Sequence, residues 1–161
     1  MKLELRDEDI AELLHRVVEQ LQPLAGPKTI RLEALRPAQR VLVRGDRERI
    51  SRVLHNLIGN SIKFTPAGGA VLVRSAREGR MVRLAVRDTG AGIDPVHLAH
   101  IFDRHYQTAP GEHDGVGLGL FIARSIVEAH GGHIWAENVP GKGCEFSFTL
   151  PLASPAAHGG P

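Results

Sequence analysis

The fold is decided by the stretch Asn56-Leu57-Ile58-Gly59-Asn60-Ser61-Ile62-Lys63-Phe64-Thr65-Pro66. It closes a segment predicted to be a helix over 47–64, because Asp46 is a good N-cap. Asn56, Asn60 and Lys63 recur at spacings of four and three, so they fall within roughly 60° of one another on the helix. The predicted core side carries Ile50, Val53, Leu54, Leu57 and Phe64. The sequence therefore predicts a polar stripe beside the edge of the core.

This polar stripe has two interpretations. A solvated helix face is the simpler one, and it is favoured for a lone Asn. Two Asn inside a helix lower its propensity, however, and here they share a face with a lysine. Amide oxygens can ligate a hard cation such as Mg²⁺, and a lysine can hold a phosphate. The stripe therefore indicates either a solvated surface or a site for a metal and phosphates.

Two glycine-rich loops follow the helix. Asp88-Thr89-Gly90-Ala91-Gly92 ends a predicted strand with a carboxylate, and its glycines allow a flat ligand to approach the backbone, although a simple turn has the same pattern. Gly115-Val116-Gly117-Leu118-Gly119-Leu120 opens a predicted helix, where free amides favour anions. It is not a P-loop, because no Lys-Ser/Thr follows, and no strand directly precedes it as a dinucleotide motif requires.

The remaining pattern predicts interspersed helices and strands. Helices are expected over 7–22, 95–102 and 117–130, and strands over 29–34, 41–43, 71–76, 81–86, 134–137 and 145–150. The stretch 103–116 has no clear period and is predicted to be a long mobile loop. Residues 153–161 are rich in Pro, Gly and Ala and are predicted to be a disordered tail. This order favours one α/β domain over 1–152, a two-layer sandwich.

Composition and charge further limit the kind of protein that this chain can be. The chain has 161 residues, of which 42% are hydrophobic and 24% charged, as expected for one soluble globular domain. No run approaches the roughly 20 apolar residues that span a bilayer, and no secretory leader is expected. The single cysteine, Cys144, cannot form an internal disulfide, which favours a reducing cytoplasm. The net charge of +2 is spread along the chain and does not favour nucleic-acid binding.

Together the motifs resemble the ATP-binding catalytic domain of sensor histidine kinases. The stretch over 56–66 resembles their N box, and the loop from Asp88 to Ile93 resembles their G1 box. Ile101-Phe102-Asp103-Arg104 resembles the F box, and the loop over 115–120 resembles the G2 box. The resemblance runs from about residue 3 to 152. It implies the Bergerat α/β sandwich of gyrase, a heat-shock chaperone and the mismatch-repair ATPase: a mixed sheet on about three helices, with residues 103–116 as a mobile ATP lid.

The resemblance also implies roles for individual residues. Asp88 would accept a hydrogen bond from the exocyclic amine of adenine, and Gly90 and Gly92 would leave room for the base. Asn60 would ligate Mg²⁺, with Asn56 beside the metal and phosphates. The implied set is completed by Lys63 against phosphate charge, by the glycines Gly115, Gly117 and Gly119 at the lid, and by the cofactor-binding residues Ile93, Phe102, Tyr106, Val116 and Leu118.

The implied activity is phosphoryl transfer. Hydrolysing branches resemble one another in a Glu four residues before the metal Asn, whereas Asn56 cannot act as a general base. The nucleophile would be a histidine on a separate dimerisation hairpin, and a response regulator would act downstream. None of the nine His has the neighbours of a phosphoacceptor. The chain is therefore expected to be a cytoplasmic monomer without membrane contact, the catalytic part of a larger kinase, binding ATP without labelling itself.

Several positions depart from the family's pattern. His105, Gln107, Asp114 and Val116 replace residues that are common around the lid, and Cys144 replaces a Ser or Thr. These departures leave two alternatives: a degenerate nucleotide-binding interaction module, or an anti-sigma-type serine kinase of the same fold. A metal site built from the histidines at 97, 100, 105 and 113 is disfavoured, because no pair has convincing ligand spacing.

Overall fold

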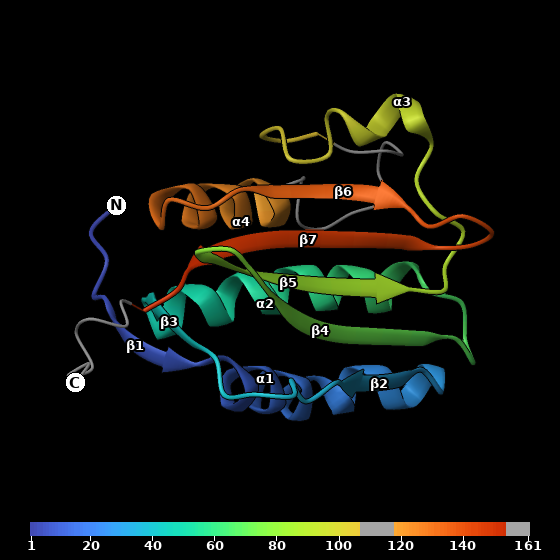
Figure 1. Ribbon diagram of the computed structural model, residues 1–161. Helices are drawn as coiled ribbons and strands as arrows, with labels where there is room; N and C mark the ends of the chain where they lie inside the picture. Colours follow the sequence, from blue (N-terminus) through green and yellow to red (C-terminus); the bar gives the residue numbers. More distant parts are fainter. Residues whose placement is uncertain (107–117, 154–161) are drawn as a thin grey trace.

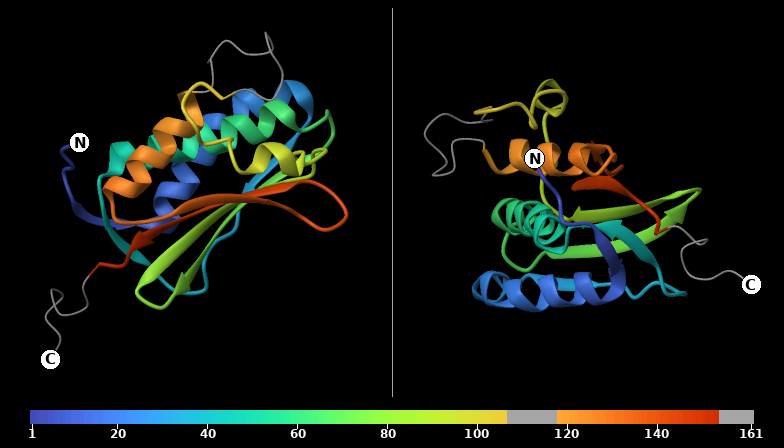
Figure 2. Two further views of the ribbon diagram at one scale, coloured as in Figure 1. Left: turned by 90° about the horizontal axis from the view of Figure 1, so that it is seen from above. Right: turned by 90° about the vertical axis from the view of Figure 1, so that its left-hand side faces the viewer.

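The computed structural model describes residues 1–106 and 118–153. Within them, three long helices cover one face of a five-stranded sheet (Figures 1 and 2). The helices are α1 (Ile10–Ala25), α2 (Arg47–Phe64) and α4 (Leu118–Ala129). The predicted two-layer α/β sandwich is therefore confirmed.

The sheet is mixed, in the order β2-β4-β5-β7-β6. Its strands are β2 (Arg31–Ala34), β4 (Ala70–Glu78), β5 (Met81–Asp88), β7 (Cys144–Pro151) and β6 (Ile134–Asn138). Only β2 and β4 run parallel, and the other neighbours are antiparallel. A separate antiparallel pair joins β1 (Arg6–Asp9) to β3 (Leu42–Gly45). The carboxyl end of central strand β5 thus places Asp88 at the edge of the sandwich.

The core lies between the sheet and the helices. Along β7 the side chains of Phe146, Phe148 and Leu150 are buried, and the neighbouring strand β5 buries Leu84 and Val86. Burying one such side chain contributes about 1.5–3 kcal/mol, so this layer supplies much of the driving force for folding. The core thereby fixes the position of α2 and of the strand end that faces it.

Both ends of α2 are capped. At its start, the Asp46 side chain accepts from the Arg49 N–H at 3.2 Å. At its end, Nζ of Lys28 donates to the carbonyl oxygens of Ile62 at 2.8 Å and Lys63 at 3.1 Å. A cation at this position also interacts favourably with the helix dipole. The predicted bounds 47–64 and the Asp46 cap are confirmed, so the polar stripe lies on one continuous helix.

Some expectations were wrong. Phe64 is not a core residue: its side chain is 46% exposed. The first helix begins at Ile10 rather than residue 7, because residues 6–9 pair with β3. The helix expected over 95–102 shortens to α3 (Pro95–Leu98), capped by Asp94, and a short 3-10 turn, η1 (Gly26–Lys28), follows α1. The predicted lid beyond residue 106 and the tail beyond residue 153 lie outside the described residues.

Among the described residues, no helix is long and apolar enough to cross a membrane.

Candidate nucleotide-binding site

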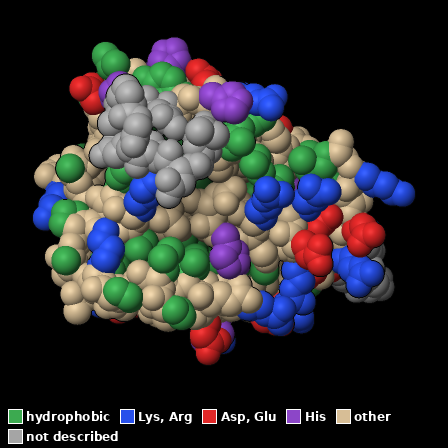
Figure 3. Space-filling model, turned by 180° about the vertical axis from the view of Figure 1, so that it is seen from behind, with side chains coloured by type: hydrophobic (Ala, Val, Ile, Leu, Met, Phe, Trp, Pro, Cys, Tyr) green, Lys and Arg blue, Asp and Glu red, His purple; other side chains and the backbone are tan. Residues whose placement is uncertain are grey.

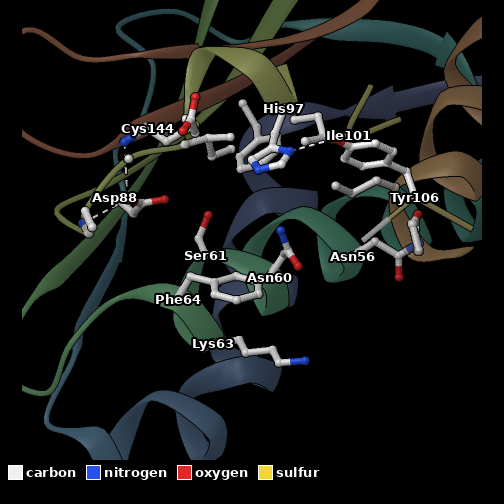
Figure 4. Close-up of a pocket in the computed structure, with 18 residues that line it drawn as sticks. Asn56, Asn60, Ser61, Lys63, Phe64, Asp88, His97, Ile101, Tyr106 and Cys144 are labelled. Atoms are coloured by element: carbon white, nitrogen blue, oxygen red, sulfur yellow. Dashed lines mark hydrogen bonds between the residues drawn. The ribbon is translucent and has the colours of Figure 1, made fainter. Parts of the chain in front are cut away.

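A cavity of about 400 Å³ opens between α2, the end of β5, α3 and the first turn of α4 (Figure 4). It brings together nine of the residues singled out in the sequence. These are Asn56, Asn60, Lys63, Asp88, Gly90, Gly92, Ile93, Tyr106 and Gly119.

The α2 wall carries the polar stripe. Asn60 and Asn56 lie one turn apart along this wall, and Lys63 lies at its rim (Figure 4). The amide nitrogen of Asn56 donates to the carbonyl oxygen of Gly119 at 2.9 Å. This bond ties α2 to the first turn of α4, and it directs Oδ1 of Asn56 away from Gly119. The stripe is therefore part of a cavity wall rather than a plain solvated face.

The opposite end of the cavity is built around Asp88, which is 7% exposed. Its Oδ1 accepts from the N–H groups of Gly90 at 2.9 Å and Cys144 at 3.3 Å. Burial raises the pKa of the Asp88 carboxyl above 3.8, although these N–H donors act to lower it. The site thus holds a desolvated carboxyl group that can accept a hydrogen bond from a ligand.

Two glycines allow the chain segments at this end to pack closely. Gly143 has φ +91°, and a Cβ there would come within 1.9 Å of the Asp88 carbonyl oxygen. Gly92 has φ +84°, and its Cβ would lie 2.9 Å from Oδ1 of Asn138. That Asn138 side chain accepts from the Ile93 N–H at 2.8 Å and donates to its carbonyl oxygen at 2.6 Å. The loop after β5 is therefore held in place by β6.

The rim beyond α3 is aromatic and imidazole in character. Nδ1 of His97 and the hydroxyl of Tyr106 share a hydrogen bond of 2.5 Å, and His100 stacks on the Tyr106 ring with centroids 5.5 Å apart (Figure 4). Both His97 and Tyr106 line the cavity. These contacts with His97 and His100 hold the Tyr106 ring across the cavity from Asp88.

Two predicted ligand-binding residues do not line the cavity. The Phe102 side chain lies in the core and packs edge-on against Phe146, with ring centroids 6.2 Å apart. Leu118 begins α4 but is not among the lining residues. The loop residues Gly115, Val116 and Gly117 lie outside the described residues.

Other lining residues were not predicted from the sequence. Ser61 and Cys144 flank Asp88, and Phe64 places a half-exposed ring at the mouth. Nζ of Lys63 lies 5.5 Å from the centroid of that ring. The position of Phe64 in the last turn, directly after Lys63, was a usable signal for an aromatic beside the polar stripe. Ser61 and Cys144 carried no such signal, because each is a single small side chain that belongs to no pattern of ligand-binding residues.

The described residues contain no group of three or more His, Cys, Asp or Glu side chains that could hold a metal ion. From behind, the space-filling view shows scattered Lys and Arg interleaved with Asp and Glu rather than one continuous basic surface (Figure 3). This distribution gives no support to nucleic-acid binding on that face.

A mixed sheet on three helices, with amide side chains on one helix facing a carboxylate and glycine loop, defines a Bergerat-type ATP-binding domain. The family model for histidine kinase-, DNA gyrase B- and HSP90-like ATPases matches residues 45–154. The chain belongs to this family.

The chain is similar to sensor kinases. It is 36% identical over 154 residues to the adaptive-response sensory kinase SasA of Synechococcus sp. (strain JA-3-3Ab), covering 94% of this chain and 41% of that protein. A structure of full-length ShkA in complex with AMPPNP matches 96% of this chain and 32% of that one, with 36% identity and a TM-score of 0.85. The chain thus spans well under half of these longer proteins.

Two structures of the histidine kinase ThkA extend the comparison. Its catalytic domain matches 92% of this chain and 95% of that one, with 31% identity and a TM-score of 0.83. ThkA in complex with the response regulator TrrA matches 94% of this chain and 42% of that one, with 30% identity and a TM-score of 0.77. This chain therefore corresponds in extent to an isolated kinase catalytic domain.

Proposed function

We propose that this domain binds Mg-ATP in the cavity and holds it for phosphoryl transfer to a histidine on a separate helical hairpin. The observation that carries the proposal is the chemistry of Asn56, an amide bonded to Gly119 where a hydrolytic site would need a carboxylate. An amide cannot accept a proton from water, so Asn56 cannot serve as a general base.

The two carboxylates that line the cavity support transfer rather than hydrolysis. Asp88 lies at the far end from Asn56 (Figure 4). Asp94 is occupied at the start of α3, where its Oδ1 accepts from the Val96 N–H at 3.0 Å. Neither carboxylate is placed to activate water beside the polar stripe. The reaction would then depend on positioning and charge neutralisation, with the nucleophile supplied from outside.

The base end of the cavity fits adenine. The Asp88 carboxyl accepts hydrogen bonds, so it favours the amino group of adenine over the oxygen of guanine. The Phe64 ring at the mouth offers a flat apolar surface to a base. The backbone around Asp88 packs closely because Gly143 and Gly92 lack a Cβ that would press on the Asp88 carbonyl oxygen or on Asn138.

The α2 wall fits a magnesium–phosphate group. The amide oxygen of Asn60 would be a magnesium ligand and that of Asn56 a second donor close to it, since Mg²⁺ prefers oxygen ligands. Lys63 would offset phosphate charge from the rim. When bound, Mg²⁺ would neutralise the charge that develops on the transferred phosphoryl group. The residues Asn56, Asn60 and Lys63 would hold and orient that group.

The domain would act as part of a longer protein. Its extent relative to SasA and ShkA supports a parent kinase that carries the histidine hairpin elsewhere in its chain. The complex of ThkA with a response regulator supports a response regulator as the next phosphate acceptor. A cytoplasmic location and a monomeric isolated domain belong to the same proposal.

The test measures binding and transfer separately. Titration calorimetry follows ATP with and without Mg²⁺, and a purified histidine hairpin from a related kinase is supplied as acceptor. We expect Mg-ATP binding, acid-labile labelling of the hairpin and no labelling of this chain. Asn60→Ala should abolish transfer with an unchanged unfolding transition, whereas the control Gln20→Ala, on the exposed side of α1, should behave as wild type.

Three outcomes would contradict the proposal. Absence of Mg-ATP binding at millimolar concentration would favour a degenerate interaction module. Acid-stable phosphate on a partner serine would favour the serine-kinase alternative. Strong labelling of the chain itself would show that the nucleophile had been misplaced.

A further inference from the structure

Ser61 holds a buried hydroxyl group that lacks a partner. Its side chain is 1% exposed and lines the cavity. Within the described part of the chain, Oγ of Ser61 makes no hydrogen bond. Buried hydroxyl groups are almost always paired, so an unpaired one next to a cavity indicates a group that a ligand or a water completes.

The usual intrahelical partner does not satisfy this hydroxyl. A serine or threonine inside a helix commonly donates to the carbonyl oxygen four residues earlier. Ser125 does so to Phe121 at 3.1 Å, and Thr65 does so to Ser61 itself at 2.7 Å. Ser61 makes no such bond. Its hydroxyl is therefore left to the cavity.

The hydroxyl lies beside the Asp88 carboxyl. Figure 4 shows Ser61 pointing from α2 toward the Asp88 end of the cavity, between Asp88 and Asn60. Ser61 is near enough to lower the pKa of Asp88, but the two groups do not complete a hydrogen bond. A hydroxyl and a carboxyl that lie side by side at a cavity can both bond the polar edge of one ligand or one bridging water.

We propose that Ser61 is a specificity-determining residue that donates its hydroxyl hydrogen to ring nitrogen N1 of adenine, directly or through one water. Asp88 would accept from the neighbouring amino group. This inference rests on the proposed function. Adenine offers a donor beside an acceptor, whereas guanine offers an acceptor beside a donor. Ser61 and Asp88 together therefore match the edge of adenine at two atoms rather than one.

The test is a double-mutant cycle that combines removal of the Ser61 hydroxyl with removal of ring nitrogen N1 from the nucleotide. Calorimetry measures ATP, 1-deaza-ATP, in which C–H replaces N1, and 7-deaza-ATP, for the wild type and Ser61→Ala. We expect Ser61→Ala to weaken the binding of ATP and 7-deaza-ATP about 3–10-fold, in line with the loss of one hydrogen bond. The affinity for 1-deaza-ATP should not change. The matched control, Ser125→Ala, removes a hydroxyl that is already paired and should affect all three nucleotides equally.

Thermal unfolding without nucleotide separates binding from structure. Removing an unpaired hydroxyl should leave the melting temperature of Ser61→Ala equal to or above that of the wild type. The inference is overturned if Ser61→Ala weakens ATP and 1-deaza-ATP by the same factor, if it weakens neither, or if it lowers the melting temperature in step with affinity. If the wild type binds ATP but the losses of affinity from Ser61→Ala and from removal of N1 simply add, only this inference is refuted. Wild-type protein that binds no ATP refutes the proposed function as well.

Discussion

The backbone N–H of Asp46 donates to Nε2 of His130 at 3.0 Å and so joins the start of α2 to the end of α4. Since Nε2 accepts, the ring proton lies on Nδ1, which donates to the carbonyl oxygen of Ile126 at 2.9 Å. His130 is 7% exposed. One buried imidazole therefore fixes the relative position of the two helices that border the cavity.

We expect His130→Ala to destabilise the fold by about 1–3 kcal/mol, because it leaves the buried Asp46 N–H unpaired and opens a void. Urea unfolding measures the change in free energy of unfolding. His15→Ala is the matched control, since the His15 side chain is 69% exposed on α1, and it should change stability by less than about 0.5 kcal/mol. Equal stability of the two variants would show that the junction does not hold the helices.

Asp88→Asn should stabilise the nucleotide-free domain and weaken ATP binding. Burial raises the pKa of Asp88 above 3.8, so the folded state binds this proton more tightly than the unfolded state. The stability contributed by the group is fully present below 3.8 and is lost as the pH rises through the raised pKa. The gain from Asp88→Asn should therefore be largest near neutral pH and should vanish toward pH 4.

Unfolding curves from pH 4 to 8 check this trend, and calorimetry at pH 7.5 checks the affinity. Losing the charged acceptor should weaken ATP about 10–150-fold, the range for a hydrogen bond to a charged group. A variant that is less stable than the wild type at pH 7 would mean that the N–H donors of Gly90 and Cys144 outweigh the burial of the charge.

The parts of the fold that could be predicted are those with local causes. The helix over 47–64 has a capping Asp46 and a regular apolar face, so its bounds follow from the sequence. β1 has neither signal: Arg6–Asp9 is a run of four charged residues, and it becomes a strand through pairing with β3 more than thirty residues later. Phe64 fits the apolar period but lies in the last turn, where α2 borders the cavity instead of the sheet.

The same distinction applies to the site. Asn56, Asn60 and Asp88 belong to contiguous motifs, so they could be predicted as site residues from the sequence. Asn138 fixes the loop at Ile93 from 45 residues away, and no local pattern predicts that contact. The role inferred for Ser61 depends on what its hydroxyl fails to reach, and this is visible only once α2 and β5 are packed.

Cys144 should resist alkylation in the native state. Burial, with the nearby Asp88 charge as the next cause, raises the pKa of its thiol from 9.0 to about 12. At pH 8 its thiolate fraction is then about a thousandfold below that of an unfolded cysteine. Mass spectrometry after iodoacetamide treatment should show slow labelling in buffer and rapid labelling in 8 M urea. The ratio of the two labelling rates should be of the order of the difference in thiolate fraction. Because Cys144 is the only cysteine, the signal comes from one site, and equal rates would mean that this end of the cavity opens to solvent.

The hydrogen bond between His97 and Tyr106 should contribute to nucleotide affinity by holding the tyrosine ring at the cavity rim. We expect His97→Leu and Tyr106→Phe each to weaken ATP about 2–10-fold, because each removes one partner of the same bond. The double variant should be no weaker than either single variant.

His97→Asn distinguishes this hydrogen bond from simple packing. An asparagine amide occupies nearly the position of Nδ1 of an imidazole, so it can still bond the Tyr106 hydroxyl, while it fills less space than leucine. We therefore expect His97→Asn to bind ATP within about twofold of the wild type, measured by the same calorimetry. If asparagine weakens binding as much as leucine does, or if the two single losses add in the double variant, then the imidazole acts through packing against the His100–Tyr106 stack and not through Nδ1.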